Sequence, residues 1–185
     1  RKKEGYGLTA KALERALEAG SQPKLLIVLD CGTNSRGEVE TAKSAGMDVL
    51  IVDHHQVGET ARSDALLNPQ LGSTHHHLCT AGLVFKLCHA YLKAEGAREQ
   101  FDLRTVLDLV ALATVADLVP LEKDNRIFVR EGLKRLVQTS HPGLRRLMEV
   151  SGSGARTPST FTLGFQLGPR INAGGRVGEA SAGLD

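Results

Sequence analysis

The chain has 185 residues, enough for one hydrophobic core or two small ones, and its 41% hydrophobic and 24% charged residues are ordinary for a globular protein. The formal net charge of only +2 excludes an argument for nucleic-acid binding from bulk charge, so any basic surface must be local. No apolar run approaches the roughly 20 residues of a membrane span, and three cysteines without zinc-type spacing favour a reducing cytoplasm over secretion.

The first part of the chain alternates between helical and strand patterns. A capping threonine and leucines spaced four residues apart predict a helix over 9–19. A continuous apolar run predicts a strand over 24–30 that is buried on both faces. A short helix over 38–45 and a second strand over 48–53 follow, and residues 66–68 can form a third strand. This order predicts a parallel sheet with helical crossovers.

The pattern becomes helical after residue 79. Four helices are expected, over 80–94, 103–115, 125–137 and 143–150. A loop rich in serine and glycine over 151–159 separates them from a glycine-rich turn over 168–178. The predicted fold class is therefore α/β, a parallel sheet with flanking helices followed by a helical segment. We expect three parts: 1–78 with the strands, 79–150 with the helices, and 151–185 as linker and start of a further region.

The segment Asp53-His54-His55, at the end of the second apolar run, is the most informative motif. Asp30 ends the first apolar run and is followed by Cys31-Gly32. Because ligands of open α/β sheets bind at the carboxyl ends of the strands, these side chains should meet at one sheet edge. Carboxylate oxygen combined with imidazole nitrogen suits manganese, zinc or iron, whereas magnesium prefers oxygen alone. The sequence therefore predicts a metal-dependent hydrolase.

A further anionic ligand would be needed, and Asp117 is the best candidate because it stands in an otherwise apolar segment. A helix-end aspartate bound by backbone amides is an equally good interpretation of Asp117. Asp30 could likewise belong to a turn, and Asp53 could be a cap. The run 75–77, three consecutive histidines, is a rival metal candidate, although a solvated loop explains it better.

Two basic features could contact phosphate. The glycine-rich turn carries Arg170, Asn172 and Arg176, and arginine offers two parallel hydrogen bonds to phosphate oxygens. Arg126 and Arg130 lie four residues apart on one face of an expected helix and could follow a nucleic-acid backbone. Solvated arginines in an ordinary loop or on an exposed helix face are the simpler alternative for both.

Taken together, these motifs resemble the DHH phosphoesterase superfamily, and within it the bacterial exonucleases specific for single-stranded DNA. The matching segments occur in the family's order, over 4–8, 28–32, 52–55, 80–86, 107–121, 125–126 and 168–176. The resemblance implies two Mn²⁺ or Mg²⁺ ions bridged by Asp30. It also implies that His54 is a ligand, that His55 lies by the metal and the scissile phosphate, that Asp117 completes the ligand set, and that Asp53 orients the histidines.

The implied activity is two-metal hydrolysis of single-stranded DNA from its 5′ end, in DNA repair and recombination. Single-strand-binding protein or a helicase are implied as candidate partners, and no membrane is expected. Two alternatives stay open: a DHH phosphodiesterase acting on oligoribonucleotides or cyclic dinucleotides, and a non-catalytic replication scaffold. The family's first motif, Asp-x-Asp, is absent and is expected upstream of Arg1. The isolated chain is therefore expected to be inactive.

Overall fold

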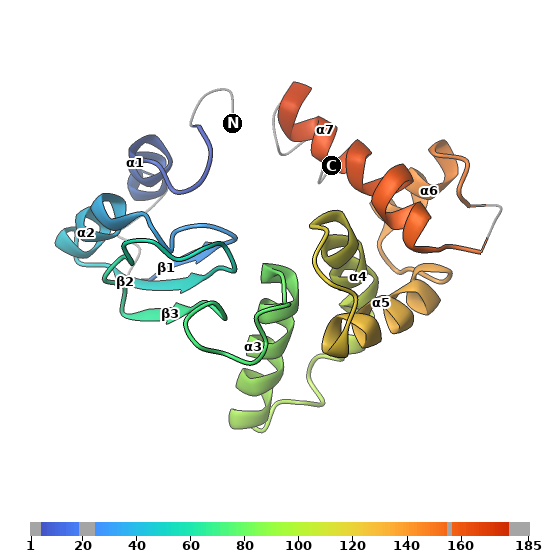
Figure 1. Ribbon diagram of the computed structural model, residues 1–185, viewed down its shortest axis with the longest axis horizontal. Helices are drawn as coiled ribbons and strands as arrows, with labels where there is room; N and C mark the ends of the chain where they lie inside the picture. Colours follow the sequence, from blue (N-terminus) through green and yellow to red (C-terminus); the bar gives the residue numbers. More distant parts are fainter. Residues whose placement is uncertain (1–4, 19–24, 155–156, 178–185) are drawn as a thin grey trace. The chain divides into compact units, whose positions relative to one another are not determined.

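The computed structural model describes residues 5–18, 25–154 and 157–177. They fall into two compact units, Arg1–His76 and His77–Asp185, each of which is described by itself (Figure 1). The first unit contains a parallel sheet with helices beside it and the second is helical, which confirms the predicted α/β class. The division of the chain into three parts stays a prediction.

The sheet of the first unit has three parallel strands in the order β1-β2-β3. They are β1 (Leu25–Leu29), β2 (Asp48–Val52) and β3 (Ala65–Leu67), with α1 (Ala10–Glu18) before them and α2 (Arg36–Ser44) between the first two. The predicted parallel pair of strands joined by a helix is therefore confirmed. Because β1, β2 and β3 run in the same direction, all three end at the same edge of the sheet (Figure 1).

The core of this unit lies between the sheet and its helices. Val49 and Ile51 of β2 are at most 1% exposed, and Val39 and Ala42 of α2 are fully buried in the same cluster. Leu13 of α1 joins them at 2% exposed. Burial of a valine, leucine or isoleucine side chain contributes about 1.5–3 kcal/mol, so these contacts hold α1 and α2 against the sheet.

The prediction that β1 is buried on both faces is wrong for the described residues. Side chains alternate between the two faces of a strand, and only the face of Val28, which is 5% exposed, joins the core. Leu25, Ile27 and Leu29 are 53%, 53% and 48% exposed. A continuous apolar run is compatible with two covered faces, but which face is covered depends on tertiary contacts.

The second unit begins with three helical segments: α3 (Thr80–Ala94), the short 3₁₀ helix η1 (Leu103–Val106) and α4 (Leu107–Ala116). The later helical segments are α5 (Lys123–Leu136), α6 (Pro142–Val150), the π-helical turn η2 (Thr162–Leu167) and α7 (Gly168–Val177). The four predicted helices are confirmed, although the one expected from residue 103 starts as a 3₁₀ turn. None of the helices in the described residues is both long and apolar enough to cross a membrane.

Helix α4 is the centre of this unit. It carries buried Val110, Ala111 and Leu112 and packs against α5 and the η2–α7 helix. Gly132 of α5 lies where a Cβ atom would collide with the carbonyl oxygen of Leu107 and the methyl of Ala111. The absence of a side chain at this glycine is therefore what lets α4 and α5 approach closely.

The prediction of a glycine-rich turn over 168–178 is wrong as far as Val177, because these residues form α7. Gly168 is not used for a turn: a Cβ atom there would lie 3.2 Å from the methyl of Ala116 in α4. The Gly168 amide bonds to the carbonyl of Leu163, five residues back, as in a π-helical turn. Pro169 follows in the first turn of α7, where a missing amide hydrogen is tolerated. Residue 178 lies outside the described residues.

Candidate metal centre

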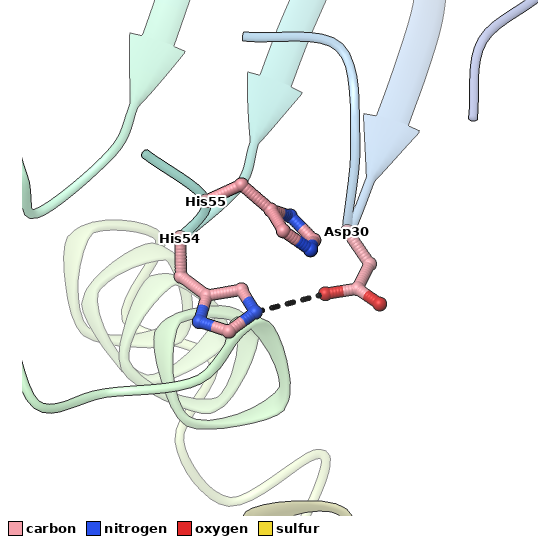
Figure 2. Close-up of side chains that lie close together, drawn as sticks. All are labelled: Asp30, His54 and His55. Atoms are coloured by element: carbon pink, nitrogen blue, oxygen red, sulfur yellow. Dashed lines mark ion pairs between the residues drawn. The ribbon is translucent and has the colours of Figure 1, made fainter. Parts of the chain in front are cut away.

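Three of the predicted site residues meet at the carboxyl edge of the sheet. Asp30 directly follows β1, and His54 and His55 follow β2 (Figure 2). One ligand atom from each residue lies within 4.8 Å of the other two, and His54 Nε2 is 3.5 Å from Asp30 Oδ1. The two imidazole rings are tilted, with centroids 4.6 Å apart. Parallel pairing of β1 with β2 thus brings together residues that are more than twenty positions apart in sequence.

The backbone at Asp30 is in an unusual conformation. Asp30 has a φ of +63°, a left-handed value that costs roughly 1–2 kcal/mol for most residues and that aspartate adopts more readily than most. Its amide donates to the carbonyl of Val52, 3.0 Å away, which fixes the turn to the neighbouring strand. Gly32 follows with a φ of +102°, and a Cβ atom there would lie 2.9 Å from Val28 Cγ1. Strain of this kind is often concentrated at functional sites.

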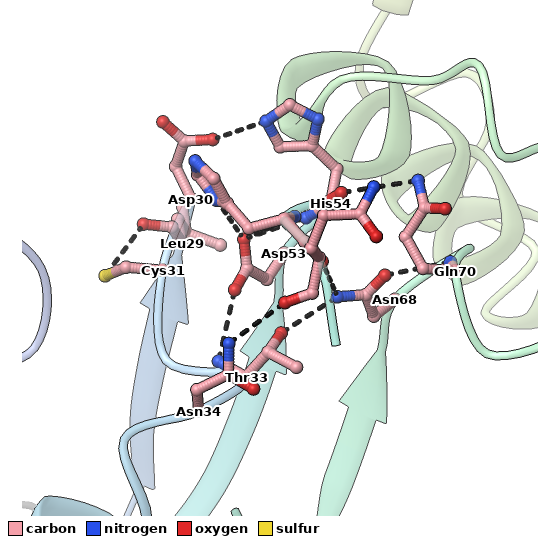
Figure 3. Close-up of polar contacts among 11 residues, drawn as sticks. Leu29, Asp30, Cys31, Thr33, Asn34, Asp53, His54, Asn68 and Gln70 are labelled. Carbon is pink, nitrogen blue, oxygen red and sulfur yellow. Dashed lines mark hydrogen bonds and ion pairs between the residues drawn. The ribbon is translucent and has the colours of Figure 1, made fainter. Parts of the chain in front are cut away.

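Asp53 fixes the conformation of the turn after β2, which carries the two histidines. This carboxylate is 1% exposed and accepts hydrogen bonds from the amides of Thr33 (3.1 Å), His54 (2.8 Å) and His55 (3.2 Å) (Figure 3). Its Oδ1 also lies 2.7 Å from His55 Nδ1. Burial raises the pKa of Asp53, but the hydrogen bonds from Thr33 and His55 outweigh burial and lower it to about 2. Asp53 is therefore ionised at neutral pH.

The contact with Asp53 determines how His55 can act. An ionised carboxylate accepts a hydrogen bond, so His55 carries its proton on Nδ1 when the ring is neutral. Nε2 of the same ring then has a lone pair for a ligand. A carboxylate that holds one nitrogen of a metal-binding imidazole in this way is a common arrangement in metal sites.

Sequence reasoning missed the residues that support Asp53. Thr33 bonds to the carboxylate through its amide, and Asn68 donates to Thr33 Oγ1 at 2.9 Å and to the His55 carbonyl at 3.0 Å (Figure 3). Asn68 is 6% exposed and directly follows β3. The available signal in the sequence was a polar residue at the end of the third apolar run, because all three strands end at this edge; its hydrogen bonds were not part of that signal.

Cys31 lies between Asp30 and the turn, and it is not suited to act as a nucleophile. Burial raises the pKa of its thiol, and the negative charges of Asp53 and Asp30 raise it further. The thiolate is therefore disfavoured at neutral pH.

The donor set fits a divalent cation. One carboxylate and two imidazoles, one of them already oriented by Asp53, match the oxygen and nitrogen ligands that manganese, iron and zinc accept. Three protein donors leave coordination positions for water or a substrate oxygen. The arrangement can therefore hold a cation at the edge of the sheet and present it to solvent.

Asp117 belongs to the second unit, and its convergence with Asp30 and His54 stays a prediction. It is exposed at the C-terminal end of α4, and its amide donates to the Ala113 carbonyl at 2.9 Å. A helix C-terminus carries partial negative charge, so the helix itself does not favour a carboxylate there. The next residue, Leu118, has a φ of +56° and is 87% exposed, a second strained position beside a candidate ligand.

The predicted phosphate contacts lie on two helices of the second unit. On α5, Arg126 is exposed and forms no ion pair with a described residue, whereas Arg130 Nε is 2.8 Å from Glu131 Oε1. On α7, Asn172 is exposed and Arg170 donates to the Gln166 carbonyl at 2.6 Å. The backbone of Arg176 is helical, and its side chain lies outside the described atoms.

The run of three histidines at 75–77 only partly forms the solvated loop that was expected. His75 and His76 are exposed, but His77 is 1% exposed, and its carbonyl accepts a hydrogen bond from buried Asn125 at 2.6 Å. The expectation of solvation is therefore wrong for His77. Its burial reflects a contact with α5 that adjacent sequence does not reveal.

The fold and the site together define an α/β domain with a carboxylate–imidazole cluster at the sheet edge. The family model for the DHH family, N-terminal domain, matches residues 3–114, and the chain belongs to this family. The chain is 37% identical to the single-stranded-DNA-specific exonuclease RecJ of Escherichia coli K12, over 98% of this chain and 33% of that protein. It is 41% identical to RecJ of Bacillus subtilis 168, over 96% of this chain and 22% of that protein.

Solved structures of RecJ exonucleases are also similar to this chain. A crystal structure of exonuclease RecJ bound to manganese matches with a TM-score of 0.85 and 33% identity, over 100% of this chain and 46% of that chain. RecJ from Thermus thermophilus in complex with Mn²⁺ matches with a TM-score of 0.81 and 32% identity, over 94% of this chain and 26% of that chain. The chain thus spans about a third or less of the length of the curated relatives it matches.

Proposed function

We propose that this chain carries part of the catalytic core of a metal-dependent exonuclease that hydrolyses single-stranded DNA from the 5′ end. The observation that carries the proposal is the meeting of Asp30, His54 and His55 at the sheet edge, with Asp53 holding His55. The relatives named as single-stranded-DNA-specific exonucleases support the choice of substrate. Repair and recombination of DNA are the processes in which such an activity is used.

The residues that would hold the cation are Asp30, His54 and His55, with Asp117 as a further carboxylate from the second unit. Mn²⁺ or Mg²⁺ are the ions proposed, because the matched structures of relatives contain one or the other. The resemblance to the family implies two ions in the complete enzyme. When bound, such ions lower the pKa of a coordinated water and neutralise charge on the phosphate.

The protein's own groups have separate tasks in this proposal. Asp53 stays ionised and keeps the Nδ1 proton on His55, so that Nε2 of this ring faces the ligand. Arg170, Asn172 and Arg176 would bind phosphate from α7, and Arg126 and Arg130 would contact the nucleic-acid backbone from α5. For Arg126, Arg170, Asn172 and Arg176 these roles rest on their position in the family's motifs. For Arg130 the role rests on its charge and on its place one turn from Arg126 on α5.

Location and partners follow from the same proposal. A DNA-degrading enzyme with the free cysteines Cys31, Cys79 and Cys88 suits the cytoplasm, whose reducing conditions keep thiols unpaired. Single-strand-binding protein or a helicase are proposed as partners, since both act where single strands are exposed.

A nuclease assay tests the proposal. The longest natural chain that contains residues 1–185 is incubated with end-labelled single-stranded DNA, duplex DNA, a dinucleotide or a cyclic dinucleotide, with Mn²⁺ or with EDTA. We expect Mn²⁺-dependent release of mononucleotides from the 5′ end of the single strand. Preference for the dinucleotides would favour the phosphodiesterase alternative, and no hydrolysis of any substrate would favour a scaffold.

Two variants make the assay specific for the site. Asp30→Asn keeps the side-chain size and, like aspartate, tolerates the left-handed backbone. It should lower the rate about a hundredfold or more, since even residues that only support metal ligands cost 10–100-fold. Asp48→Asn is the matched control, because Asp48 is an exposed aspartate at the opposite end of β2 from the histidines. It should leave the rate unchanged.

A further inference from the structure

Two aromatic side chains are stacked on the exposed face of the helical segment that leads into α7. Phe161 and Phe165 are 60% and 69% exposed, and their rings are nearly parallel, with centroids 5.1 Å apart and planes inclined by 22°. Exposed single apolar residues are ordinary, whereas exposed apolar side chains that gather into one patch can mark a binding site.

The fold of this unit does not require these rings. Leu163 and Leu167 of the same segment are fully buried in the core cluster that α4 also joins. They supply the packing of the helix, whereas the phenylalanines point away from it.

The sequence that carries the pair favours an anionic ligand. From residue 150 to residue 178 the sequence contains no aspartate or glutamate, but it contains Arg156, Arg170 and Arg176. Arg170 is exposed in the helix that continues from Phe165, and its Nη1 is held by the Gln166 carbonyl at 2.6 Å. Flat aromatic faces followed by arginines are the combination that binds single-stranded nucleic acid.

We propose that Phe161 and Phe165 form a platform on which a base of a single-stranded nucleic acid stacks, while Arg170 contacts a neighbouring phosphate. The inference deepens the proposed function, on which it rests, by naming the residues that bind bases of the substrate. The near-parallel rings support it, because a base placed on the outer ring extends the existing stack. Stacking is tolerant of base identity, so the platform binds single strands without sequence preference.

The test measures the affinity for a fluorescein-labelled 20-nucleotide single strand by anisotropy, in EDTA, with the longest natural chain that contains residues 1–185. The double variant Phe161→Leu/Phe165→Leu keeps apolar bulk but removes the aromatic faces. We expect its Kd to rise roughly 5- to 100-fold. Phe161→Tyr/Phe165→Tyr retains the faces and should bind within about twofold of wild type.

Two controls separate stacking from other effects. Phe101→Leu removes an aromatic ring that is 49% exposed elsewhere in the same unit, and it should not change the Kd. A strand of the same length made of abasic nucleotides keeps the phosphates but has no bases. The leucine variant and wild type should bind this strand equally, because there is nothing to stack.

Results that would rule out base stacking on the two phenylalanines differ from results that would rule out the proposed exonuclease activity. Wild-type affinity in the leucine variant would identify the patch as an apolar contact for another protein segment. An equal loss on the abasic strand would show that the variant acts through the backbone or the fold. In either case wild type would still hydrolyse single strands with Mn²⁺. A wild-type protein that neither binds nor hydrolyses single strands would defeat the proposed function and the platform together.

Discussion

Asp53 is the residue on which the geometry of the site depends most. It is buried beneath the histidines and accepts hydrogen bonds from three backbone amides and from the His55 ring. The same hydrogen bonds keep the carboxylate ionised and fix the direction of the turn after β2. The shape of the site and the charge state of Asp53 are thus two results of one set of contacts.

A stability measurement can detect this coupling. The pKa of Asp53 is lowered to about 2 in the folded protein, below its ordinary value of 3.8. Its ionisation therefore stabilises the fold by roughly 2 kcal/mol above pH 5, and this contribution is lost as the pH falls toward 2. In EDTA, the stability difference between wild type and Asp53→Asn, from urea unfolding, should shrink between pH 5 and pH 3. A constant difference over this range would show that the ionised carboxylate is not favoured by folding.

Gly32 combines a left-handed backbone conformation with a close neighbour, Val28. Gly32 and Gly72 both have a positive φ, +102° and +90°, but only a Cβ atom at Gly32 would meet a neighbour within contact distance, Val28 Cγ1 at 2.9 Å. Both substitutions by alanine should therefore destabilise the protein through the backbone, and Gly32→Ala should cost about 1 kcal/mol more because of the collision. Thermal unfolding of the two variants measures the difference. Equal destabilisation would mean that Val28 moves aside.

At the scale of helices and strands, apolar runs and caps predicted the elements well. The strands form at the runs of leucine and β-branched residues in the sequence, and α3 begins and ends at the predicted residues. The error at 168–177 has a physical cause. Glycine and proline usually interrupt helices, but here Gly168 serves close packing against α4 and Pro169 lies in the first turn of α7. Only the contact with α4 distinguishes a glycine that packs within a helix from one that ends it. That contact is tertiary, so the local sequence does not reveal it.

The contact between α4 and α5 gives the corresponding prediction for an element. A methyl group at Gly132 would overlap Leu107 and Ala111, and backbone cannot move aside as a flexible side chain can. Gly132→Ala should therefore destabilise the second unit by about 1–3 kcal/mol, even though alanine favours helix formation. Gly143→Ala in α6, where nothing lies near the added atom, is the matched control. A Gly132→Ala protein with wild-type melting temperature would contradict the close packing.

At the scale of the whole molecule, the site prediction depended on pairing between strands. The ends of β1 and β2 could be predicted to meet because parallel strands finish at one edge, and Asp30, His54 and His55 do lie together. The supporting hydrogen bonds of Thr33 and Asn68 could not be predicted, because they depend on the register between loops. The exposed Phe161–Phe165 pair was also missed, since the sequence does not say which face of a helix is covered.

The basic residues of the second unit make a prediction for substrate binding. Arg126 has no ion-pair partner among the described residues, whereas Arg130 is paired with Glu131. Arg126→Ala should therefore weaken binding of single-stranded DNA and reduce the slope of log K against log salt by about 0.7. Arg130→Ala should reduce the slope less. An unchanged slope for Arg126→Ala would identify that helix face as simply solvated.

Asp30, His54 and His55 should form a cation site, and a Mn²⁺ titration followed by electron paramagnetic resonance detects binding at such a site. Bound Mn²⁺ loses the sharp six-line spectrum of the free ion. The chain should bind Mn²⁺, and Asp30→Asn and His54→Ala should each weaken binding about tenfold or more, whereas Asp48→Asn should bind as wild type does. Circular dichroism confirms that each variant is folded. Folded Asp30→Asn and His54→Ala proteins with wild-type Mn²⁺ affinity would show that these residues do not bind the cation.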